Sequence, residues 1–204
     1  AFIFMFFLWR YLVSVKIYNA LKNKNQELEN IKKELIISNK NLKYLSFHDN
    51  LTKLYNRHYF MSTLEDHFNN VVRQRGVSAI LMIDIDFFKK INDQYGHSVG
   101  DKVLQQFSSI LSEVLRAGDI PARWGGEEFI VLLPKANKEE TLSLAKRLSE
   151  AVEQFTFELN IKLTISVGIS QYNAHDNVES WIERADIALY KAKNDGRNCI
   201  KEMA

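Results

Sequence analysis

Two aspartates, Asp84 and Asp86, directly follow the apolar run Val77–Ile83, which is typical of a buried strand. A buried strand holds carboxylates rigidly at the edge of a sheet, where hard cations such as Mg²⁺ bind through oxygen. We expect Asp86 instead to cap a helix that begins at Phe87, because aspartate is a favoured N-cap residue. Asp84 is therefore the better candidate for a metal ligand.

A second pair of acids, Glu127 and Glu128, follows the glycines Gly125 and Gly126. Glycine permits positive φ and leaves no side chain to obstruct a phosphate or base that approaches the backbone. Because neighbouring residues of an extended strand point to opposite faces, we expect only one of the two glutamates to join Asp84. Adjacent glutamates in a turn are often merely solvated, and it is the presence of two acidic strand ends in one domain that favours a shared site.

The elements that position these acids alternate between helices and strands. Helical periodicity is expected over 57–74, 101–116, 138–154 and 179–194. Strands are expected over Val77–Ile83, Ile120–Trp124, Glu128–Leu133, within 155–171 and near Asn198–Ile200. The two glycines indicate a hairpin turn between the second and third of these strands. This mixture predicts an α+β fold with a central, mainly antiparallel sheet flanked by helices.

Several short motifs together resemble the GGDEF domain of diguanylate cyclases, enzymes that join two GTP into cyclic di-GMP. The segments that carry the resemblance are Gly125-Gly126-Glu127-Glu128-Phe129, Asp49-x-Leu51-Thr52-x-Leu54-x-Asn56-Arg57, Asp84-Ile85-Asp86-Phe87-Phe88-Lys89, Asn92, Gly96-His97, Gly100-Asp101 and Lys193-x-x-Gly196-Arg197. They cover about residues 47–201, and none departs from the family pattern. The resemblance implies a nucleotidyl-cyclase-like fold and an active enzyme that releases pyrophosphate.

The resemblance also implies a metal site, in which Asp84, the backbone carbonyl of Ile85 and Glu127 bind two Mg²⁺ ions, with Mn²⁺ able to replace them. Metal ions there would bridge the phosphates, activate the 3′-OH and stabilise the departing pyrophosphate. Glu127 is the family's proposed general base. A carboxylate that holds a metal is a weak base, so the alternative is that the metal does most of the activation. Gly125 and Gly126 would lie against the substrate.

Five side chains match substrate-binding positions of the family: Asn92, His97, Asp101, Lys193 and Arg197. Asn92 and Asp101 would bind guanine, because an amide both donates and accepts and a carboxylate accepts from N1–H and N2–H₂. Adenine lacks that donor pair, so discrimination is expected. Lys193 and Arg197 would hold the β- and γ-phosphates, or else form a solvated helix terminus. His97 is either a substrate contact or a structural histidine.

The segment Arg116–Asp119 lies where the family has an inhibitory site that binds the product. The resemblance assigns Arg116 and Asp119 to that site, with Arg147 as a second guanidinium, since arginine stacks on guanine and pairs with phosphate. The alternative is local: Arg116 favours a helix C-terminus and Gly118 ends the helix.

Gly96-His97-Ser98-Val99-Gly100 also fits the G-x-S-x-G pattern of serine hydrolases. That motif needs a strand that leads into a sharp turn, whereas the polar stretch Lys89–Tyr95 precedes it here. The hydrolase interpretation is therefore disfavoured.

The composition is that of a globular protein, with 204 residues, 46% hydrophobic and 25% charged, and a net charge of +2. It excludes a disordered or collagen-like chain, and a single cysteine, Cys199, excludes a disulfide scaffold. The charge is uneven, because residues 1–48 carry a net +5 and residues 49–204 a net −3. The folded part has no overall basic surface, and no nucleic-acid partner is expected.

The apolar run Phe2–Trp9 is about half as long as the roughly 20 residues that a membrane span needs. It lacks an initiator methionine and a basic n-region, so it does not match a complete signal peptide. We expect residues 1–15 to be the C-terminal part of a transmembrane helix, with Trp9 and Tyr11 at the interface. The protein would then lie in the inner membrane with its catalytic domain in the cytoplasm. An interfacial amphipathic helix and a soluble apolar helix are the alternatives.

Residues 16–47 contain no Pro or Gly and have a leucine at every seventh position, namely Leu21, Leu28, Leu35 and Leu42. If these are a positions, the d positions are Lys24, Ile31, Ser38 and Leu45, and half of that layer is polar. This pattern predicts a parallel coiled coil of modest stability, which would join two copies of the cyclase domain, residues 48–204, as a homodimer. The alternative is a single long helix packed on its own domain.

Two other classes of function stay open from the sequence. One is a non-catalytic receptor domain that binds GTP or cyclic di-GMP within a membrane signalling protein. The other is a structural dimerisation module at the membrane. The intact Asp84, Glu127 and Lys193 disfavour the receptor, and a purely structural module leaves the two acidic strand ends unexplained.

Overall fold

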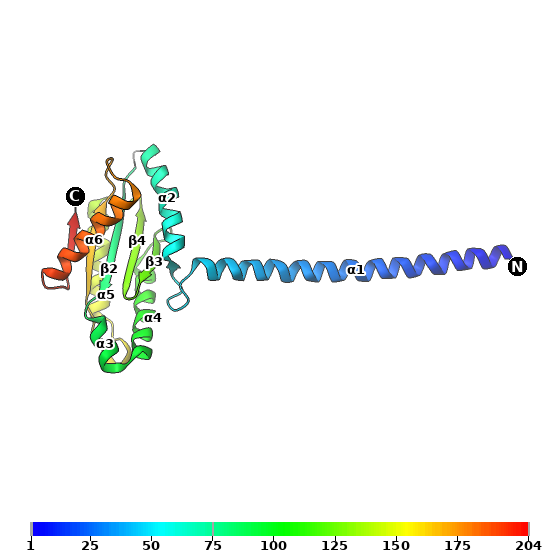
Figure 1. The fold of residues 1–204 in the computed structure, drawn as a ribbon, viewed down its shortest axis with the longest axis horizontal. Coiled ribbons are helices and arrows are strands. Elements are labelled where there is room, and N and C mark those ends of the chain that lie inside the picture. The colour runs from blue at the N-terminus through cyan, green and yellow to red at the C-terminus, as the bar shows by residue number, and fades with distance from the viewer. Residues whose placement is uncertain (1, 75, 204) are drawn as a thin grey trace. The chain divides into compact units, whose positions relative to one another are not determined.

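The computed structural model describes residues 2–74 and 76–203, and it does not describe the side chains of residues 20, 39–43 and 74. The predicted heptad leucine at position 42 therefore lies outside the described side chains. The chain divides into two compact units, Ala1–Ser46 and Phe47–Ala204 (Figure 1). The boundary between the units falls at the C-terminal end of the first helix.

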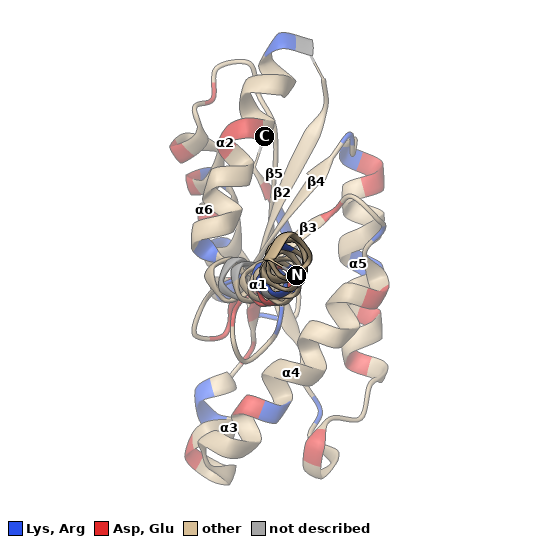
Figure 2. Ribbon diagram, turned by 90° about the vertical axis from the view of Figure 1, so that its right-hand side faces the viewer, with Lys and Arg blue, Asp and Glu red and all other residues tan. Residues whose placement is uncertain are grey.

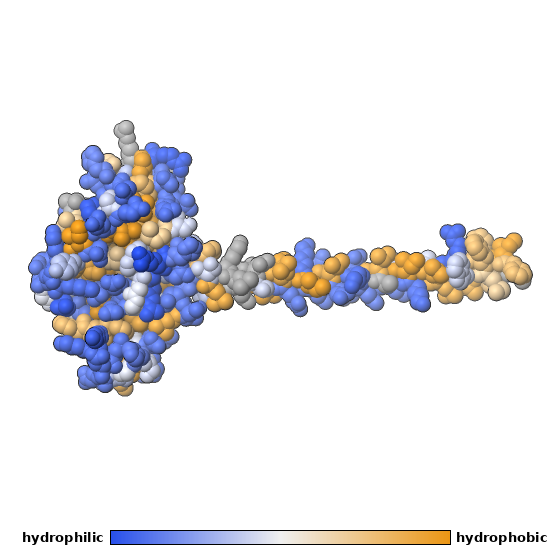
Figure 3. All heavy atoms as spheres, viewed as in Figure 1, coloured by the Kyte–Doolittle hydropathy of each residue, from blue (hydrophilic) through white to orange (hydrophobic). Residues whose placement is uncertain are grey.

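The first unit is formed by one continuous helix, α1 (Phe2–Phe47), as expected for a stretch without Pro or Gly. Its apolar side chains are exposed, and Leu21, Leu28, Ile31, Leu35 and Leu45 are each more than half accessible. Figure 3 shows apolar patches along the helix and a further apolar group at its N-terminal end. Within the part of the chain that is described, α1 contains one segment, Phe2–Ser38, that is long and apolar enough to cross a membrane.

The second unit is built on a sheet of six strands in the order β1-β3-β4-β2-β5-β6. The strands are β1 (Tyr55–Asn56), β2 (Ser78–Ile85), β3 (Ile120–Gly125), β4 (Glu128–Pro134), β5 (Ile165–Gln171) and β6 (Ile200–Met203). The central strand β2 is antiparallel to both β4 and β5, and β3 is antiparallel to β4. The edge strands β1 and β6 are parallel to their neighbours. The predicted fold class, a mainly antiparallel sheet flanked by helices, is confirmed.

Two helical layers cover the sheet (Figures 1 and 2). Helices α2 (Arg57–Gln74) and α6 (Val178–Asn194) pack on one face with Ile80 and Met82 of β2. Helices α3 (Phe88–Tyr95), α4 (His97–Val114) and α5 (Lys138–Gln154) lie on the other face, where Leu81 and Ile83 are buried. The alternation of β2 side chains between two cores is the period-two pattern of a strand buried on both faces.

Gly168 of β5 allows α6 to lie unusually close to the sheet. A Cβ atom at this position would overlap the backbone of Ala185 and Leu189, so a larger residue would push the helix away. The close approach also brings Lys193, in the last turn of α6, to the end of β2, where it donates a hydrogen bond to Asp84.

Three boundaries differ from the sequence predictions. The polar stretch 89–95 is part of a helix, α3, and α4 begins at His97 instead of residue 101. Strand β5 begins only at Ile165, because a 3-10 turn (Glu158–Asn160) with positive φ at Leu159 and Asn160 interrupts the preceding chain. Ile161 and Leu163 are buried but lie before the strand. Their alternation with polar residues therefore reflects burial of every second side chain in a segment that is not part of the sheet.

Candidate active site

Asp84 lies at the end of β2, on the face of the sheet that α6 covers. Its side chain is only 7% exposed. The Lys193 ammonium donates a hydrogen bond to its carboxylate over 2.6 Å. The register of the sheet places Glu128 of β4 directly opposite Asp84, and directly opposed residues share a face. Two carboxylates and one ammonium therefore converge at this end of the sheet.

The hairpin between β3 and β4 brings a third carboxylate to the same end. Gly126 and Glu127 form its two-residue turn, with φ of 52° at Gly126, and a Cβ added at Gly125 or Gly126 would meet open space. The backbone N–H of Ile85 donates to the carbonyl of Glu127 at 3.4 Å. The turn lies one residue later than the two glycines suggested. The expectation that only one glutamate joins Asp84 assumed that both lie in an extended strand. Glu127 lies in the turn instead, so this assumption does not hold.

The charges around Asp84 change its acidity. The pKa of Asp84 is raised to about 6. Burial is the largest cause, the hydrogen bond and charge of Lys193 oppose it in part, and the negative charges of Glu127 and Glu128 add to it. A single ammonium thus does not compensate the buried carboxylate and its acidic neighbours. A site of this kind favours an added cation.

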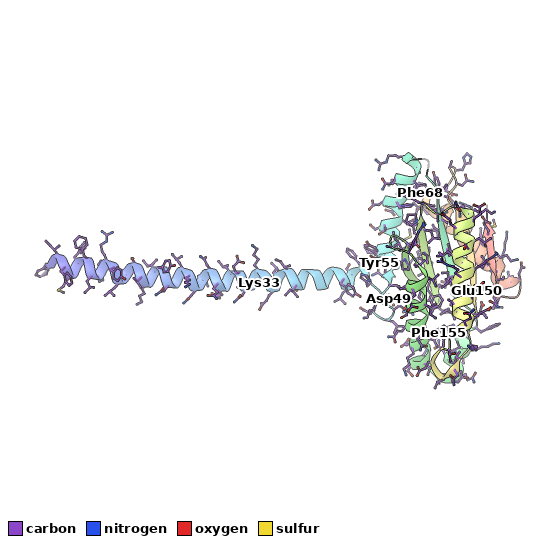
Figure 4. The ribbon with its side chains drawn as sticks, turned by 180° about the vertical axis from the view of Figure 1, so that it is seen from behind. Lys33, Asp49, Tyr55, Phe68, Glu150 and Phe155 are labelled. Carbon is purple, nitrogen blue, oxygen red and sulfur yellow. The ribbon has the colours of Figure 1, made fainter. Side chains whose placement is uncertain are left out.

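Arg123 connects the hairpin to the first turn of the domain. Its guanidinium donates to the carbonyl of Gly126 at 2.8 and 3.0 Å and to the carboxylate of Asp49 at 3.2 and 3.3 Å. Asp49, labelled in Figure 4, also accepts hydrogen bonds from the backbone N–H and the hydroxyl of Thr52. Although burial acts to raise it, these hydrogen bonds and the Arg123 charge lower the pKa of Asp49. Arg123 therefore fixes the turn that carries Glu127, a role that no sequence motif indicated.

Asp86 does not cap a helix, so that prediction is wrong. The N-cap residue of α3 is Phe87, and no side chain bonds there. The Asp86 carboxylate instead accepts hydrogen bonds from the hydroxyls of Thr164 and Ser166, both at 2.7 Å, and from the backbone N–H of Asn198 at 3.0 Å. Thr164 directly precedes β5, Ser166 belongs to it and Asn198 follows α6, so only the tertiary structure brings these donors to Asp86.

Three of the residues matched to substrate binding lie at the junction of α3 and α4. Asn92 is half-buried on α3, whereas His97 and Asp101 are exposed in the first turns of α4. Gly100 lies so close to the Asn92 amide that a Cβ there would overlap it. The segment Gly96–Gly100 joins one helix to the next, so it lacks the strand that a serine-hydrolase motif requires.

The two cations matched to phosphate binding lie at and after the C-terminus of α6. Lys193 is in the last turn of the helix and pairs with Asp84. Arg197 follows the helix with φ of 64°, and its guanidinium carbon lies 4.8 Å from the centroid of the Phe87 ring.

A separate cavity of about 250 Å³ is lined by both Arg116 and Arg147, together with Asp119. The Arg116 side chain donates to the Asp119 carboxylate at 3.3 Å, and Arg147 donates to the carbonyl of Val114 at 2.9 Å. The cavity lies at the end of the β3–β4 hairpin opposite to its turn, since Arg116 also donates to the carbonyl of Pro134 at the end of β4. The structure thus brings the three residues matched to the inhibitory site together.

Residues 46–199 match the family model described as diguanylate cyclase, GGDEF domain. The chain belongs to this family. The chain is 40% identical over 173 residues to diguanylate cyclase A of Treponema denticola, an alignment that covers 81% of this chain and 47% of that protein. It is 38% identical over 159 residues to diguanylate cyclase DgcM of Escherichia coli K12, which covers 78% of this chain and 39% of the relative. The chain therefore spans less than half the length of these curated relatives.

Solved structures of GGDEF domains have the same fold. The coiled coil and GGDEF domain of DgcB from Caulobacter crescentus, in complex with c-di-GMP, aligns with a TM-score of 0.80 at 26% identity, over 92% of this chain and 99% of that one. The active GGEEF domain of a diguanylate cyclase from Vibrio cholerae aligns with a TM-score of 0.70 at 32% identity, over 73% and 97% of the two chains.

Proposed function

We propose that this chain is a diguanylate cyclase, which condenses two GTP into cyclic di-GMP and releases pyrophosphate. The observation that carries the proposal is the convergence of Asp84, Glu127 and Lys193 at one end of the sheet of a GGDEF domain. Carboxylates for a metal and a cation for phosphate are the groups that phosphoryl and nucleotidyl transfer require.

We propose Mg²⁺ as the metal, with Mn²⁺ as a substitute, held by Asp84, the carbonyl of Ile85 and Glu127. Among the described residues, no three acidic, histidine or cysteine side chains form a closed metal site. The partial donor set fits Mg²⁺, which commonly binds one or two carboxylates and takes other ligands from phosphates and water. Bound there, the metal supplies activation of the 3′-OH and neutralisation of charge on the phosphates. Asp84, which burial and the charges of Glu127 and Glu128 leave uncompensated, would gain an attractive partner from a cation held there.

The remaining side chains bind and orient the nucleotide. Lys193 holds Asp84 before GTP binds and then shares its ammonium with the phosphates, and Arg197 adds charge-assisted hydrogen bonds to them. Asn92 and Asp101 bind the guanine edge, with His97 nearby. We propose Glu127 as the acceptor of the proton of the attacking hydroxyl, with activation of the hydroxyl by the metal as the alternative.

The product contains two identical phosphodiester bonds, so two GTP-loaded domains must face each other. We propose that residues 16–47 of α1 form a parallel coiled coil in a homodimer, in which the exposed Leu28, Ile31 and Leu35 meet their counterparts. The coil raises the effective concentration of the second domain. Residues 1–15 anchor the chain in the inner membrane, and residues 48–204 form the catalytic domain in the cytoplasm.

We further propose that cyclic di-GMP inhibits the enzyme at the cavity of Arg116, Asp119 and Arg147. Two guanidiniums suit a dinucleotide, because each stacks on guanine and pairs with phosphate. The Arg116→Ala variant is expected to retain activity and to lose feedback inhibition in assays with added cyclic di-GMP. Unaltered inhibition would remove the assignment.

The function is tested by incubating the chain with GTP and Mg²⁺ and measuring cyclic di-GMP by mass spectrometry. Glu127→Ala is the inactive control, and a chain with Leu28 and Leu35 replaced by polar residues is expected to bind GTP without turnover. A chain that binds GTP or cyclic di-GMP but forms no product would instead be a receptor.

A further inference from the structure

Phe87 presents a large aromatic ring to solvent beside the proposed phosphate-binding cations. The residue is 51% exposed, so burial of apolar surface does not account for it. The guanidinium carbon of Arg197 lies 4.8 Å from the ring centroid, and the ammonium of Lys90 lies 4.4 Å from it. Both separations are within the range of cation–π attraction.

The backbone of Phe87 is strained. Its φ of 57° and ψ of 23° lie in the left-handed region, which a bulky residue rarely adopts and which glycine or asparagine adopts more easily. Strained residues of this kind cluster at functional sites, where the surrounding structure holds them. A phenylalanine at this position is explained neither by burial nor by backbone preference.

Two backbone hydrogen bonds fix the chain around Arg197, and one of them is to Asp86, which follows β2. The Asp86 carboxylate accepts the N–H of Asn198, and the N–H of Arg197 donates to the carbonyl of Ala192 at 3.1 Å. The backbone of Arg197 is thus held from two sides, and the ring of Phe87 contacts its guanidinium. Without the ring, the long side chain would be free to sample other rotamers in solvent.

We propose that Phe87 is a positioning residue that holds the Arg197 guanidinium in place for the phosphates before GTP binds. The proposal rests on the proposed function, in which Arg197 binds phosphate. The ring acts through Arg197 and does not itself touch the reacting atoms. An arginine that is already ordered loses less conformational entropy when the nucleotide arrives, so its contribution appears in affinity for GTP.

The test compares Phe87→Asn, which removes the ring and suits the left-handed backbone, with the conservative variant Phe87→Tyr, which keeps the ring. Phe87→Asn is expected to raise KM for GTP about two- to fivefold with kcat changed by less than about twofold, the range that an exposed cation–π contact allows. Phe87→Tyr, which keeps the aromatic ring, is expected to have the KM of the wild type. Thermal unfolding of Phe87→Asn is expected at or above the wild-type midpoint, which excludes a folding defect as the cause.

A double-mutant cycle separates positioning from a general effect. If Phe87 acts through Arg197, Phe87→Asn adds no further increase in KM to the Arg197→Met variant. Lys90→Met is the matched control, because it removes the other cation from the ring while leaving the Arg197 contact. An unchanged KM in Phe87→Asn, or the same increase with and without Arg197, would overturn the proposal.

Direct titration separates this proposal from the proposed function. The ligand is a GTP analogue in which a methylene group replaces the α,β-bridging oxygen, so that pyrophosphate cannot leave, and the readout is calorimetric affinity with Mg²⁺. If the wild type makes no cyclic di-GMP but binds the analogue, the proposed function fails, and weaker binding by Phe87→Asn still supports the role of Phe87. Equal binding by the two chains overturns that role, and no binding by the wild type overturns both.

Discussion

Asp84 and Asp86 are two residues apart on one strand, nearly equally buried at 7% and 3% exposure, yet their surroundings differ. Asp86 accepts three hydrogen bonds from neutral donors in the domain. Asp84 has one ammonium and two repelling glutamates near it. Asp86, whose hydrogen bonds are all made within the domain, serves the structure. Asp84, whose charge is not compensated, is available for a ligand.

The largest expected effect is on turnover at Asp84. Asp84→Asn keeps the size of the side chain but removes the charge that the proposed metal requires, so we expect cyclic di-GMP formation to fall about 100-fold or more. The variant should fold normally by circular dichroism. Turnover within about tenfold of the wild type would contradict the assignment of Asp84 as a metal ligand.

The converse change, Asp86→Ala, should act on stability. It leaves the hydroxyls of Thr164 and Ser166 and the N–H of Asn198 without their shared acceptor, which is expected to cost about 2–4 kcal/mol in the free energy of unfolding. Urea denaturation measures this cost. A loss of activity in a variant of wild-type stability would show that the two aspartates do not divide their roles in this way.

The pH dependence of stability sharpens the comparison. Because the pKa of Asp84 is raised to about 6 in the folded chain, its protonation favours folding, and this contribution is present at low pH and is lost as the pH rises through 6. Without metal, the wild type is expected to lose about 1–2 kcal/mol of stability relative to Asp84→Asn between pH 5 and 8.

The Asp84→Asn reference also cancels the effect of His67, whose pKa is lowered by burial and which titrates equally in both chains. The measurement is urea unfolding of both proteins in EDTA across this pH range. Added Mg²⁺ is expected to stabilise the wild type and not the variant. Parallel pH profiles of the two proteins would contradict the uncompensated charge at Asp84.

Asp49 combines features of both aspartates. Its charge is compensated by Arg123, as the fold satisfies Asp86, but Arg123 also holds the hairpin of the candidate active site, to which Asp84 belongs. Asp49→Asn removes the charge on one side of Arg123 and should loosen the turn that carries Glu127. We expect a loss of about 1 kcal/mol in stability and a fall of about threefold to tenfold in kcat. Steady-state kinetics with GTP decide this, and Asn50→Ala, in the same turn, is the control.

The sequence predicted the elements that carry Asp84 and Glu127, but not the partners of Asp86 or the position of Glu128. The apolar run before Asp84 and the glycines before Glu127 are local signals, so the strand and the hairpin were predicted correctly, and the roles of the two acids stay predictions. The partners of Asp86 are 78, 80 and 112 residues away along the chain and come together only in the folded domain, so its local preference for a helix cap was misleading. Glu128 lies beside Asp84 because the register of β2 and β4 pairs these two residues, and a single sequence does not specify that register.

The β3–β4 hairpin joins the two sites of the domain, with the turn of Glu127 at one end and the Arg116 cavity at the other. Its two strands are paired from Ile120 to Gly125 with a register shift between Arg123 and Gly125, so this pairing sets the spacing between the acids and the guanidiniums. Insertion of one residue in either strand would reverse the faces of the side chains beyond it. A change of length in the loops around the hairpin would leave this spacing intact, whereas a change within the hairpin would preserve the pairing only if it occurred in both strands.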